Sequence, residues 1–468
     1  MQEQLDILQR VVKASQKQTQ PVGNALPAAE LLATLDLSLG QEGSDIEQLE
    51  KALLDYVHYS PNVAHPEYFK LLYSGLNKEA LLGDWVASLN NSTMHTYQVG
   101  PVATLMELEL LEQFARLVGY TEAEGVMVSG GSQANIVGMM LARHRACPDF
   151  KDTGYSALGN KRLIAYVSDQ SHYSNQRAVN VLGIGSDNLR SVESDEQGRM
   201  IPKKLEQAIA QDVEDAHVPF FIGLTAGTTV TGAYDPVRPT REIADKYGMW
   251  LHIDGAWGAP VLFSERHKHL LADSQLADSF AWDAHKFMNV PITAGVILVK
   301  HKGALKECTA GGGGDYLFHA DQNAQFNLGE RSLQCGRRAD ALKVWLSWKA
   351  VGTKGFANKL DYLQYLKQDA LQLIKQQPQL QILAEAAYLN VLFRFYHPDL
   401  NEEKSVELNI KICQFIRESG GAYVDYAKYK GRTGIRLILA NKETQISHVQ
   451  KLTDQVVQAG NQLVRELN

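Results

Sequence analysis

Residues 250–300 read WLHIDGAWGAPVLFSERHKHLLADSQLADSFAWDAHKFMNVPITAGVILVK, and this stretch decides the fold. An apolar run rich in β-forming residues ends at Asp254, and a segment compatible with a helix follows it. A second short apolar run leads to His285 and Lys286, and a third extends from Ala294 to Val299. Alternation of strand, helix and strand predicts a parallel sheet, which places chemistry at the carboxyl ends of its strands. We therefore expect Asp254 and Lys286 to face the same rim of one sheet.

An acid and a lysine at one rim meet the needs of a site for pyridoxal phosphate (PLP). The lysine amine condenses with the cofactor's aldehyde as a Schiff base, and the carboxylate holds the pyridine nitrogen protonated so that the ring accepts electrons. Taken alone, Asp254 and Lys286 are more often two solvated polar side chains. The remaining motifs decide between these two interpretations.

The composition is that of an ordinary globular enzyme, with 468 residues of which 45% are apolar and 21% charged. The net charge of −7 without a basic stripe argues against nucleic acid as a partner. No apolar run approaches the roughly 20 residues of a membrane helix, and the N-terminus lacks the features of a signal peptide. The cysteines show no CxxC spacing, so we expect neither disulfides nor a metal site, and a cytoplasmic location; they are Cys147, Cys308, Cys335 and Cys413.

The sequence texture predicts three regions: an N-terminal helical segment over residues 1–85, a large cofactor-binding α/β domain over 86–355, and a small α+β domain over 356–468. The first region carries a capping box of Ser44 and Glu47, and its apolar stripe could pack on the main domain or on a second subunit. The candidate strands of the large domain are 125–129, 163–167, 220–224, 250–253, 279–282 and 296–299. In the small domain we expect strands at 390–396 and 434–439, with helices at 359–376, at 406–418 and from about 444.

Three further motifs follow candidate strands. Residues 129–135, SGGSQAN, precede a helical run, where glycine backbone amides, a helix N-terminus and the Ser132 hydroxyl could hold a phosphate; plain packing is equally compatible. His172 could stack on a pyridine ring and handle protons, although a lone histidine is more often a surface or capping residue. Thr228 could hydrogen-bond the cofactor or orient Asp254, or belong to an ordinary β-turn. The order of turn, histidine, threonine, aspartate and lysine, each after a strand, favours a single site.

With these motifs in view, the chain resembles the group II PLP-dependent amino-acid decarboxylases, and among them most the animal-type glutamate and cysteine sulfinate decarboxylases. The resemblance extends over nearly the whole chain from residue 65 onward. The matching motifs are His65-Pro-Glu-Tyr-Phe69, Thr96-Tyr-Gln-Val-Gly-Pro-Val102, Gly130-Gly131, Gln170-Ser-His172-Tyr-Ser174, Ala226-Gly-Thr228-Thr229, His252-Ile-Asp254-Gly-Ala-Trp257, Trp282-Asp-Ala-His285-Lys286, Gln334-Cys-Gly-Arg337 and Trp345-Leu-Ser-Trp-Lys349. As a set, these motifs are highly specific.

The resemblance implies the PLP-dependent transferase fold of the aspartate aminotransferase type, known as fold type I. That fold has a mainly parallel seven-stranded sheet in its large domain and a smaller α+β C-terminal domain. The resemblance also implies a homodimer with active sites at the subunit interface and N-terminal helices that cross to the partner. The implied reaction is α-decarboxylation of an L-amino acid, which releases CO₂ and an amine.

The same resemblance implies roles for single residues. Lys286 carries the Schiff base, Asp254 pairs with the ring nitrogen, and His172 stacks over the ring. Thr228 supports Asp254 and the side of the ring oxygen, and Arg436 binds the substrate α-carboxylate, for which a guanidinium fork is well suited. The residues implied for the phosphate are Gly131, Ser132 and His285.

One segment departs from the family pattern. Relatives carry a tyrosine on a mobile loop that reprotonates the α-carbon, and here Ala324 or Phe326 occupies that place. His172 and His319 are the candidate substitutes for the missing acid. Because loss of the loop hydroxyl favours side reactions in relatives, a decarboxylating aldehyde synthase or an aminotransferase on the same fold stays an alternative.

The substrate is expected to be acidic: glutamate, aspartate or cysteine sulfinate. Leu71 stands where the glutamate enzymes have a glutamine, and Tyr73 where the cysteine sulfinate enzymes have an aromatic residue. Thr93 and His95 replace other pocket residues, and a bulkier pocket favours a shorter acidic substrate. A 2,4-diaminobutyrate decarboxylase stays an alternative, as does a non-catalytic regulatory relative, against which the retained Lys286 argues.

Overall fold

The structure, a computed structural model, describes residues 1–16, 21–23, 26–311, 314 and 316–467. The chain divides into two compact units. The first comprises Met1–Gly75, Tyr365–Ala384 and Asn390–Asn468, and the second comprises Leu76–Gln364 and Glu385–Leu389. The N-terminal helices thus belong to the same unit as most of the C-terminal region, while the three domains expected from the sequence stay a prediction.

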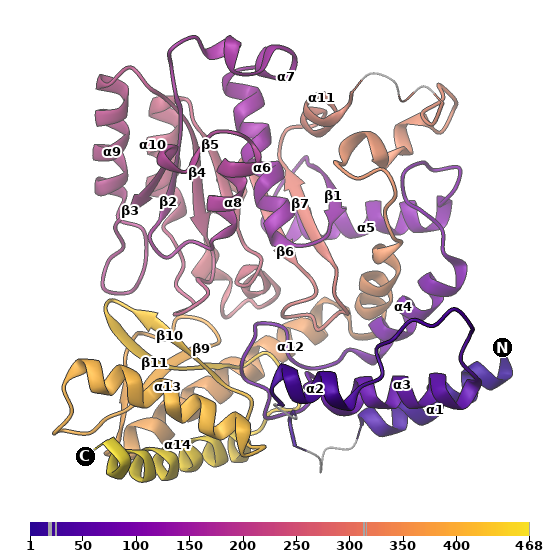
Figure 1. Ribbon diagram of the computed structural model, residues 1–468. Coiled ribbons are helices and arrows are strands. Elements are labelled where there is room, and N and C mark those ends of the chain that lie inside the picture. Colours follow the sequence, from indigo (N-terminus) through magenta and orange to yellow (C-terminus); the bar gives the residue numbers. More distant parts are fainter. Residues whose placement is uncertain (17–20, 24–25, 312–313, 315, 468) are drawn as a thin grey trace. The chain divides into compact units, whose positions relative to one another are not determined.

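The second unit is built on a seven-stranded sheet with the order β1-β7-β6-β5-β4-β2-β3 (Figure 1). Its strands are β1 (Glu124–Val128), β2 (Leu163–Ser168), β3 (Leu189–Val192), β4 (Val218–Thr225), β5 (Trp250–Asp254), β6 (Ser279–Asp283) and β7 (Gly295–Val299). The neighbours from β3 to β6 pair in parallel, and β7 pairs antiparallel with both β6 and β1. Among these strands only β7 runs against the others, which confirms the mainly parallel seven-stranded sheet.

All six candidate strands of the large domain are present, because each is a run of buried apolar residues bounded by turn-forming ones. Strand β3 was not among the strands predicted from the sequence. It is four residues long, lies at the edge of the sheet and is only partly buried, so its sequence carries little apolar signal.

The helix expected after Asp254 is wrong. Residues 255–278 contain the short 3₁₀ turns Ala259–Phe263, Lys268–Leu271 and Ser274–Leu276 in its place. Two glycines explain the difference, because a Cβ on Gly255 would lie 2.5 Å from the Phe280 ring and one on Gly258 would lie 2.4 Å from the Ala226 carbonyl oxygen. This segment is therefore shaped by close packing against neighbouring strands and not by helix propensity.

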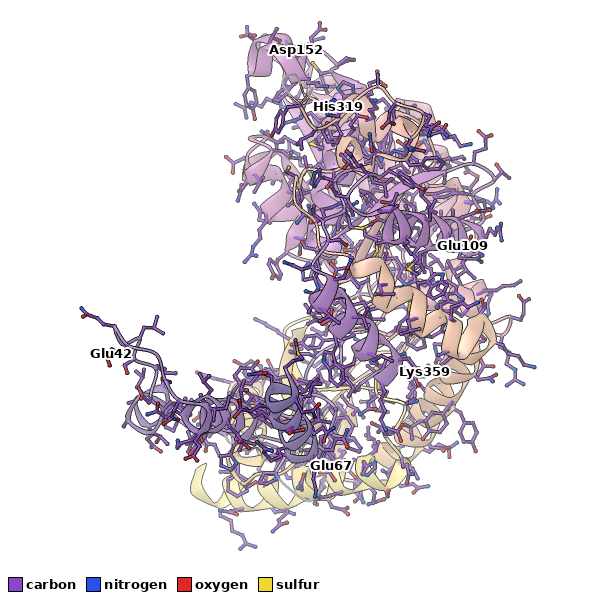
Figure 2. The ribbon with its side chains drawn as sticks, turned by 90° about the vertical axis from the view of Figure 1, so that its right-hand side faces the viewer. Glu42, Glu67, Glu109, Asp152, His319 and Lys359 are labelled. Atoms are coloured by element: carbon purple, nitrogen blue, oxygen red, sulfur yellow. The ribbon has the colours of Figure 1, made fainter. Side chains whose placement is uncertain are left out.

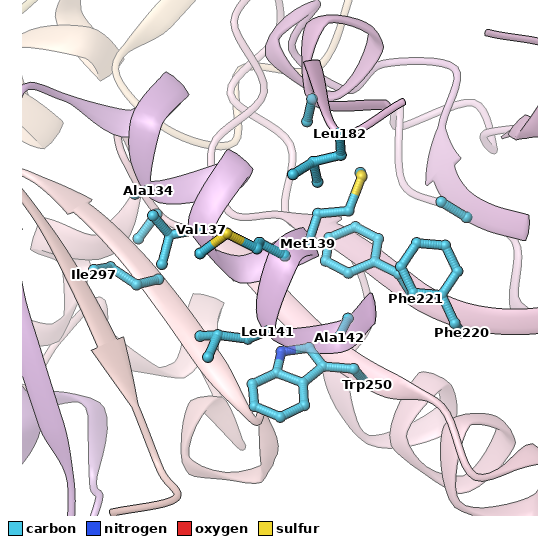
Figure 3. Close-up of a cluster of buried hydrophobic side chains, with 14 of the residues drawn as sticks. Ala134, Val137, Met139, Leu141, Ala142, Leu182, Phe220, Phe221, Trp250 and Ile297 are labelled. Atoms are coloured by element: carbon cyan, nitrogen blue, oxygen red, sulfur yellow. The ribbon is translucent and has the colours of Figure 1, made fainter. Parts of the chain in front are cut away.

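The second unit also contains helices. They are α4 (Lys78–Asn90), α5 (Pro101–Val118), α6 (Gly131–Ala146), α7 (Phe150–Thr153), α8 (Ser174–Val181), α9 (Pro202–Glu214), α10 (Val237–Tyr247), α11 (Ala304–Thr309) and, as far as Gln364, α12 (Asp340–Gln376), which is interrupted at Gly352. Helix α6 packs across β4, β5, β6 and β7, whereas α9 contacts β3 and β4 and α10 contacts β4 and β5 (Figure 1). Figure 3 shows the resulting core, in which Val137 and Met139 of α6 lie among Phe221, Trp250 and Ile297 of the sheet.

The first unit combines N-terminal helices with a second sheet. Its helices are α1 (Gln2–Ser15), α2 (Ala28–Thr34), α3 (Ile46–Tyr59), α13 (Glu402–Glu418) and α14 (Ile446–Leu467). Its sheet has the order β10-β11-β9-β8, all antiparallel, with β8 (Leu380–Ile382), β9 (Asn390–Phe395), β10 (Asp425–Tyr429) and β11 (Arg432–Ile438). The expected capping box of Ser44 and Glu47 is wrong by one residue, since Asp45 and Gln48 form it. Within the described ranges, the helices lack an apolar stretch of the length and hydropathy needed to span a bilayer.

Candidate active site

Asp254 lies at the carboxyl end of β5 and is 8% exposed. Its Oδ1 accepts a hydrogen bond of 3.1 Å from the Ala256 backbone N–H, and its Oδ2 accepts one of 2.7 Å from Asn135 Nδ2 on α6. Both carboxylate oxygens are therefore held by donors from different elements. The carboxylate is fixed in one orientation at the rim where the sequence predicted it.

Lys286 lies in the turn that follows β6. Its Nζ is 3.2 Å from Oδ2 of Asp283, the last residue of β6, so the ammonium group has a buried carboxylate as its partner. Lys359 on α12 supports the next part of the turn, because its Nζ donates to the Phe287 carbonyl oxygen and to Asn289 Oδ1. Hydrogen bonds from Lys359 therefore stabilise the turn that carries Lys286.

His172 follows β2, and its Nδ1 accepts a hydrogen bond of 3.2 Å from the Ser174 backbone N–H. Burial lowers the pKa of His172, the Asp254 carboxylate opposes that shift, and the Lys286 ammonium group adds to it. The imidazole is therefore mainly neutral near pH 7. Because both charges act on it, His172 lies in the same electrostatic neighbourhood as Asp254 and Lys286.

The SGGSQAN turn leads into the N-terminus of α6, as the sequence predicted, with Gly130 at φ +156° and Gly131 as the first helical residue. A Cβ on Gly130 would lie 3.3 Å from His285 Cε1, and one on Gly131 would lie 3.0 Å from Asp283 Oδ2 and 2.9 Å from Ala256 Cβ. Glycine at both positions therefore lets this helix start pack directly against His285, Asp283 and Ala256, where a side chain would collide. Of the three residues predicted for the phosphate, Gly131 and Ser132 begin the helix, and His285 borders the glycine turn.

His285 adds a buried imidazole to this corner. Its Nδ1 accepts a hydrogen bond of 3.1 Å from the Ala294 backbone N–H, and its Nε2 lies 3.7 Å from Asp283 Oδ2. Burial lowers the pKa of His285, and the Asp283 carboxylate opposes that shift. A bound acceptor on the Nε2 side would receive a hydrogen bond from the ring, since Nδ1 is already occupied as an acceptor.

Thr228 is fully buried in the turn after β4. Its hydroxyl oxygen lies 2.9 Å from Thr231 Oγ1 and accepts a hydrogen bond of 3.0 Å from the Ala233 backbone N–H. The hydroxyl therefore forms its hydrogen bonds within its own turn, and the side chain that donates to Asp254 is Asn135. The role of Thr228 toward a cofactor stays a prediction.

Sequence reasoning missed Asn135 and Asp283 as members of this site. Both lay inside motifs that had been singled out, the SGGSQAN turn and the segment that ends in Lys286. Asn135 is a polar residue one turn into an otherwise apolar helical run, and this position could have indicated a buried hydrogen-bonding role. For Asp283, the signal was its spacing of three residues before Lys286.

Thr93 and His95 lie on a segment that is tied to the chain around residues 329–338. Thr93 Oγ1 is 3.1 Å from His95 Nδ1 and accepts a hydrogen bond of 3.2 Å from the Arg337 backbone N–H, while the His95 carbonyl accepts one of 2.9 Å from Gly329. His319 lines a cavity of about 280 Å³ together with Thr96, Tyr97 and Gln98. Figure 2 labels His319 and Lys359, which lie toward opposite ends of the second unit.

Tyr73 and Arg436 belong to the first unit. Arg436 lies on β11 opposite Asp425 of β10, and its Nη2 donates a hydrogen bond of 2.9 Å to the Lys70 carbonyl oxygen. Burial lowers the pKa of Arg436, which the Asp425 carboxylate opposes. Tyr73 lies close enough to raise the pKa of Tyr68, after the larger effect of burial. Their roles toward a substrate stay predictions.

The residues of the second unit fit PLP. The site offers an amine for the aldehyde, a fixed carboxylate for the ring nitrogen, a flat imidazole beside both, and a glycine turn at a helix N-terminus for the phosphate. Among the described residues, no group of three or more His, Cys, Asp or Glu side chains is arranged to hold a metal ion. The geometry therefore defines a class of protein, the enzymes that hold PLP at the carboxyl ends of a mainly parallel sheet.

The comparison with known families agrees with this class and narrows it. The chain belongs to the pyridoxal-dependent decarboxylase family, because the model described as "Pyridoxal-dependent decarboxylase conserved domain" matches residues 28–396. The family resemblance, the fold type I architecture and the cofactor expected from the sequence are thereby confirmed.

Two similar proteins and one solved structure match most of the chain. It is 34% identical over 465 residues to the acidic amino acid decarboxylase GADL1 of Mus musculus, a match that covers 97% of this chain and 84% of that protein. It is 37% identical over 377 residues to the cysteine sulfinic acid decarboxylase of Mus musculus, which covers 80% of this chain and 76% of that protein. The crystal structure of mouse CSAD superimposes with a TM-score of 0.94 at 31% identity over 98% of this chain and 97% of that chain. The protein is thus an amino-acid decarboxylase that uses PLP.

Proposed function

We propose that this decarboxylase acts on an acidic L-amino acid, with aspartate, glutamate or cysteine sulfinate as the substrate. The single observation that carries the proposal is the similarity to the acidic amino acid decarboxylase GADL1 over 97% of the chain. The position of Tyr73, where cysteine sulfinate enzymes have an aromatic residue, favours the shorter substrates. A diaminobutyrate substrate is the alternative that the assay below includes.

The proposed roles follow from the geometry of the site. When bound, PLP supplies a ring that accepts the electron pair released when the α-carboxyl group leaves. Lys286 would hold the cofactor covalently, and Asp254 would hold a proton on the ring nitrogen. Gly131, Ser132 and His285 would hold the phosphate; the neutral His172 would lie against the ring.

Arg436 is proposed to bind the α-carboxylate of the substrate. A guanidinium group can grip a carboxylate through two parallel hydrogen bonds, which fixes the bond that must break. Burial lowers the pKa of Arg436 and the Asp425 carboxylate opposes part of that shift, and the very high ordinary pKa of arginine keeps the group charged. Thr93, His95 and Tyr73 are proposed to line the part of the pocket that reads the substrate side chain.

We also propose that the enzyme is a homodimer in the cytoplasm. The support for the dimer is an apolar groove of about 540 Å³ on the second unit, lined by residues of α4 and α5 such as Val86, Leu89 and Val102, which are all exposed. The four free cysteines are compatible with a reducing compartment. Sedimentation of the purified protein tests the dimer: a single-chain mass would contradict it, and cell fractionation tests the location.

The function is tested by a product screen. Purified protein loaded with PLP is given aspartate, glutamate, cysteine sulfinate and 2,4-diaminobutyrate in parallel, and CO₂, amine, aldehyde and hydrogen peroxide are measured. We expect CO₂ and amine in equal amounts with one or more of the acidic substrates, and neither product from Lys286→Ala. Aldehyde without amine would contradict simple decarboxylation, and turnover of diaminobutyrate alone would contradict the acidic substrate.

A further inference from the structure

A chain of buried hydrogen bonds runs from the interior of the second unit to Asp254. Trp250 Nε1 lies 2.8 Å from Ser279 Oγ, which lies 2.8 Å from His252 Nδ1. His252 Nε2 lies 2.9 Å from Asn135 Oδ1, and Asn135 Nδ2 lies 2.7 Å from Asp254 Oδ2. The four members before Asp254 are at most 3% exposed, so water does not interrupt the chain.

The direction of every hydrogen bond in this chain is determined by its two ends. An indole N–H only donates, and an ionised carboxylate only accepts. Asn135 must therefore turn its amide N–H₂ toward Asp254 and its Oδ1 toward His252. His252 must then carry its proton on Nε2 and accept at Nδ1 from the Ser279 hydroxyl, whose oxygen accepts from Trp250.

The second hydrogen of the Asn135 amide is also used. It points to Ser174 Oγ at 2.9 Å, at the start of α8, so the amide cannot rotate without losing two partners. His252 is similarly constrained. A Cβ on Gly138 would lie 2.7 Å from its Nδ1, and the Phe221 ring stacks on it at 5.8 Å between centroids.

Burial lowers the pKa of His252 to about 4, which keeps the imidazole neutral at physiological pH. In the neutral ring Nδ1 accepts the Ser279 hydroxyl proton, whereas protonation of Nδ1 would reverse the direction of that hydrogen bond. Consecutive donors that point the same way strengthen one another in a low-dielectric interior. Every donor in this chain points toward Asp254.

We infer that Asn135 and His252 are positioning residues of the decarboxylase, which together fix the Asp254 carboxylate for the cofactor's ring nitrogen. The inference rests on the proposed role of Asp254. Neither residue was assigned a role by the sequence motifs, and His252 acts entirely through Asn135. The essential feature is the Nε2–H donor of His252, since it fixes the amide that holds Asp254 Oδ2.

The test compares two substitutions of one histidine. His252→Gln keeps an N–H donor near the position of Nε2, whereas His252→Leu removes it at similar volume. We expect His252→Leu to raise the dissociation constant for PLP by about tenfold and to change the visible circular dichroism of the bound cofactor, while His252→Gln stays within about twofold of wild type. Tyr166→Phe is the matched control, because it deletes a buried hydrogen bond to Asp212 in the same unit, away from Asp254.

Asn135→Asp provides a second variant of nearly unchanged shape. It replaces the donor that faces Asp254 by a carboxylate oxygen, so we expect at least the tenfold loss of PLP affinity with the apo-protein still folded. Equal PLP affinity and dichroism in wild type, His252→Leu and Asn135→Asp would overturn the inference, as would His252→Gln behaving like His252→Leu. A wild-type protein that binds no PLP would instead overturn the proposed function.

Discussion

Arg337 and Glu107 form a buried ion pair whose energetic coupling can be predicted from its geometry. Arg337 Nη1 donates to Glu107 Oε1 and Oε2 at 2.9 and 3.1 Å, and the two residues are 5% and 1% exposed. Arg337 also donates to the carbonyl oxygens of Met127 and Met94, and Glu107 Oε1 accepts from the Met127 backbone N–H. The pair therefore joins α5, the end of β1 and the segment that carries Thr93 and His95.

Removal of the arginine alone leaves a carboxylate buried without its partner. Arg337→Met is expected to lower the free energy of unfolding of the apo-protein by about 3–5 kcal/mol, the usual cost of breaking a buried pair. Glu107→Gln in wild type is expected to cost about 1–3 kcal/mol, because the guanidinium group keeps only neutral acceptors. On the Arg337→Met background the same Glu107→Gln change should stabilise by about 2 kcal/mol, since it removes the unpaired charge while an amide oxygen still accepts from Met127 N–H.

The effect of Glu107→Gln on the free energy of unfolding should thus change sign between the two backgrounds. It is measured by urea unfolding of wild type, the two single variants and the double variant, followed by tryptophan fluorescence and circular dichroism. Arg238→Met is the control: its partner Asp273 is at a partly exposed site, so the loss should stay within about 1 kcal/mol. If Glu107→Gln destabilises wild type and the Arg337→Met variant equally, the two side chains act independently and the reasoning fails.

Three further outcomes are expected. Gly131→Ala should raise the PLP dissociation constant by about tenfold or more, because its Cβ would lie 2.9 Å from Ala256 Cβ and 3.0 Å from Asp283 Oδ2; equilibrium titration of the apo-protein measures this, and unchanged affinity would remove the glycine turn from the phosphate site. Arg436→Ala should lower kcat/KM for every accepted α-amino acid, and a loss confined to one substrate would mean that Arg436 reads the side chain instead. His252 has a pKa of about 4 in the folded protein against about 6.5 unfolded, so its contribution to stability is complete above pH 6.5 and is lost by about 3 kcal/mol as the pH falls to 4. The His252→Gln variant should lack this part of the acid-induced loss of stability in urea unfolding at several pH values, and parallel curves for the two proteins would contradict the assignment.

The sheet was predictable because its strands are short buried apolar runs. Six of the seven strands of the large sheet followed from that signal, and the polar residues that end them marked the rim. The segment after Asp254 was not predictable in the same way. Its backbone follows contacts of Gly255 with the Phe280 ring and of Gly258 with the Ala226 carbonyl, and such contacts exist only once the strands are assembled.

The sequence brought together the residues proposed to carry the reaction more readily than those proposed to choose the substrate. Lys286, Asp254 and His172 each follow a strand of one sheet, so their order along the chain already indicated a common rim. The residues proposed to recognise the substrate side chain are divided between the two units, with Tyr73 in the first unit and His95 in the second. The spacing of residues along the chain does not predict which of them select the substrate. Turnover assays of the candidate substrates in parallel identify the substrate directly.

The hydrogen-bond partner of the Asp254 side chain could not be predicted from single motifs. The resemblance to the decarboxylases implied Thr228 for this role, while the residues alone left an ordinary β-turn open. In the folded chain that hydroxyl bonds within its own turn, and the donor is Asn135, 119 residues from Asp254 in sequence. An asparagine that is completely buried in an apolar helix needs partners for three or more polar functions, and α6 meets this need only by crossing β5, where both His252 and Asp254 lie. The requirement to satisfy one buried amide therefore links the packing of the helix on the sheet to the orientation of the Asp254 carboxylate.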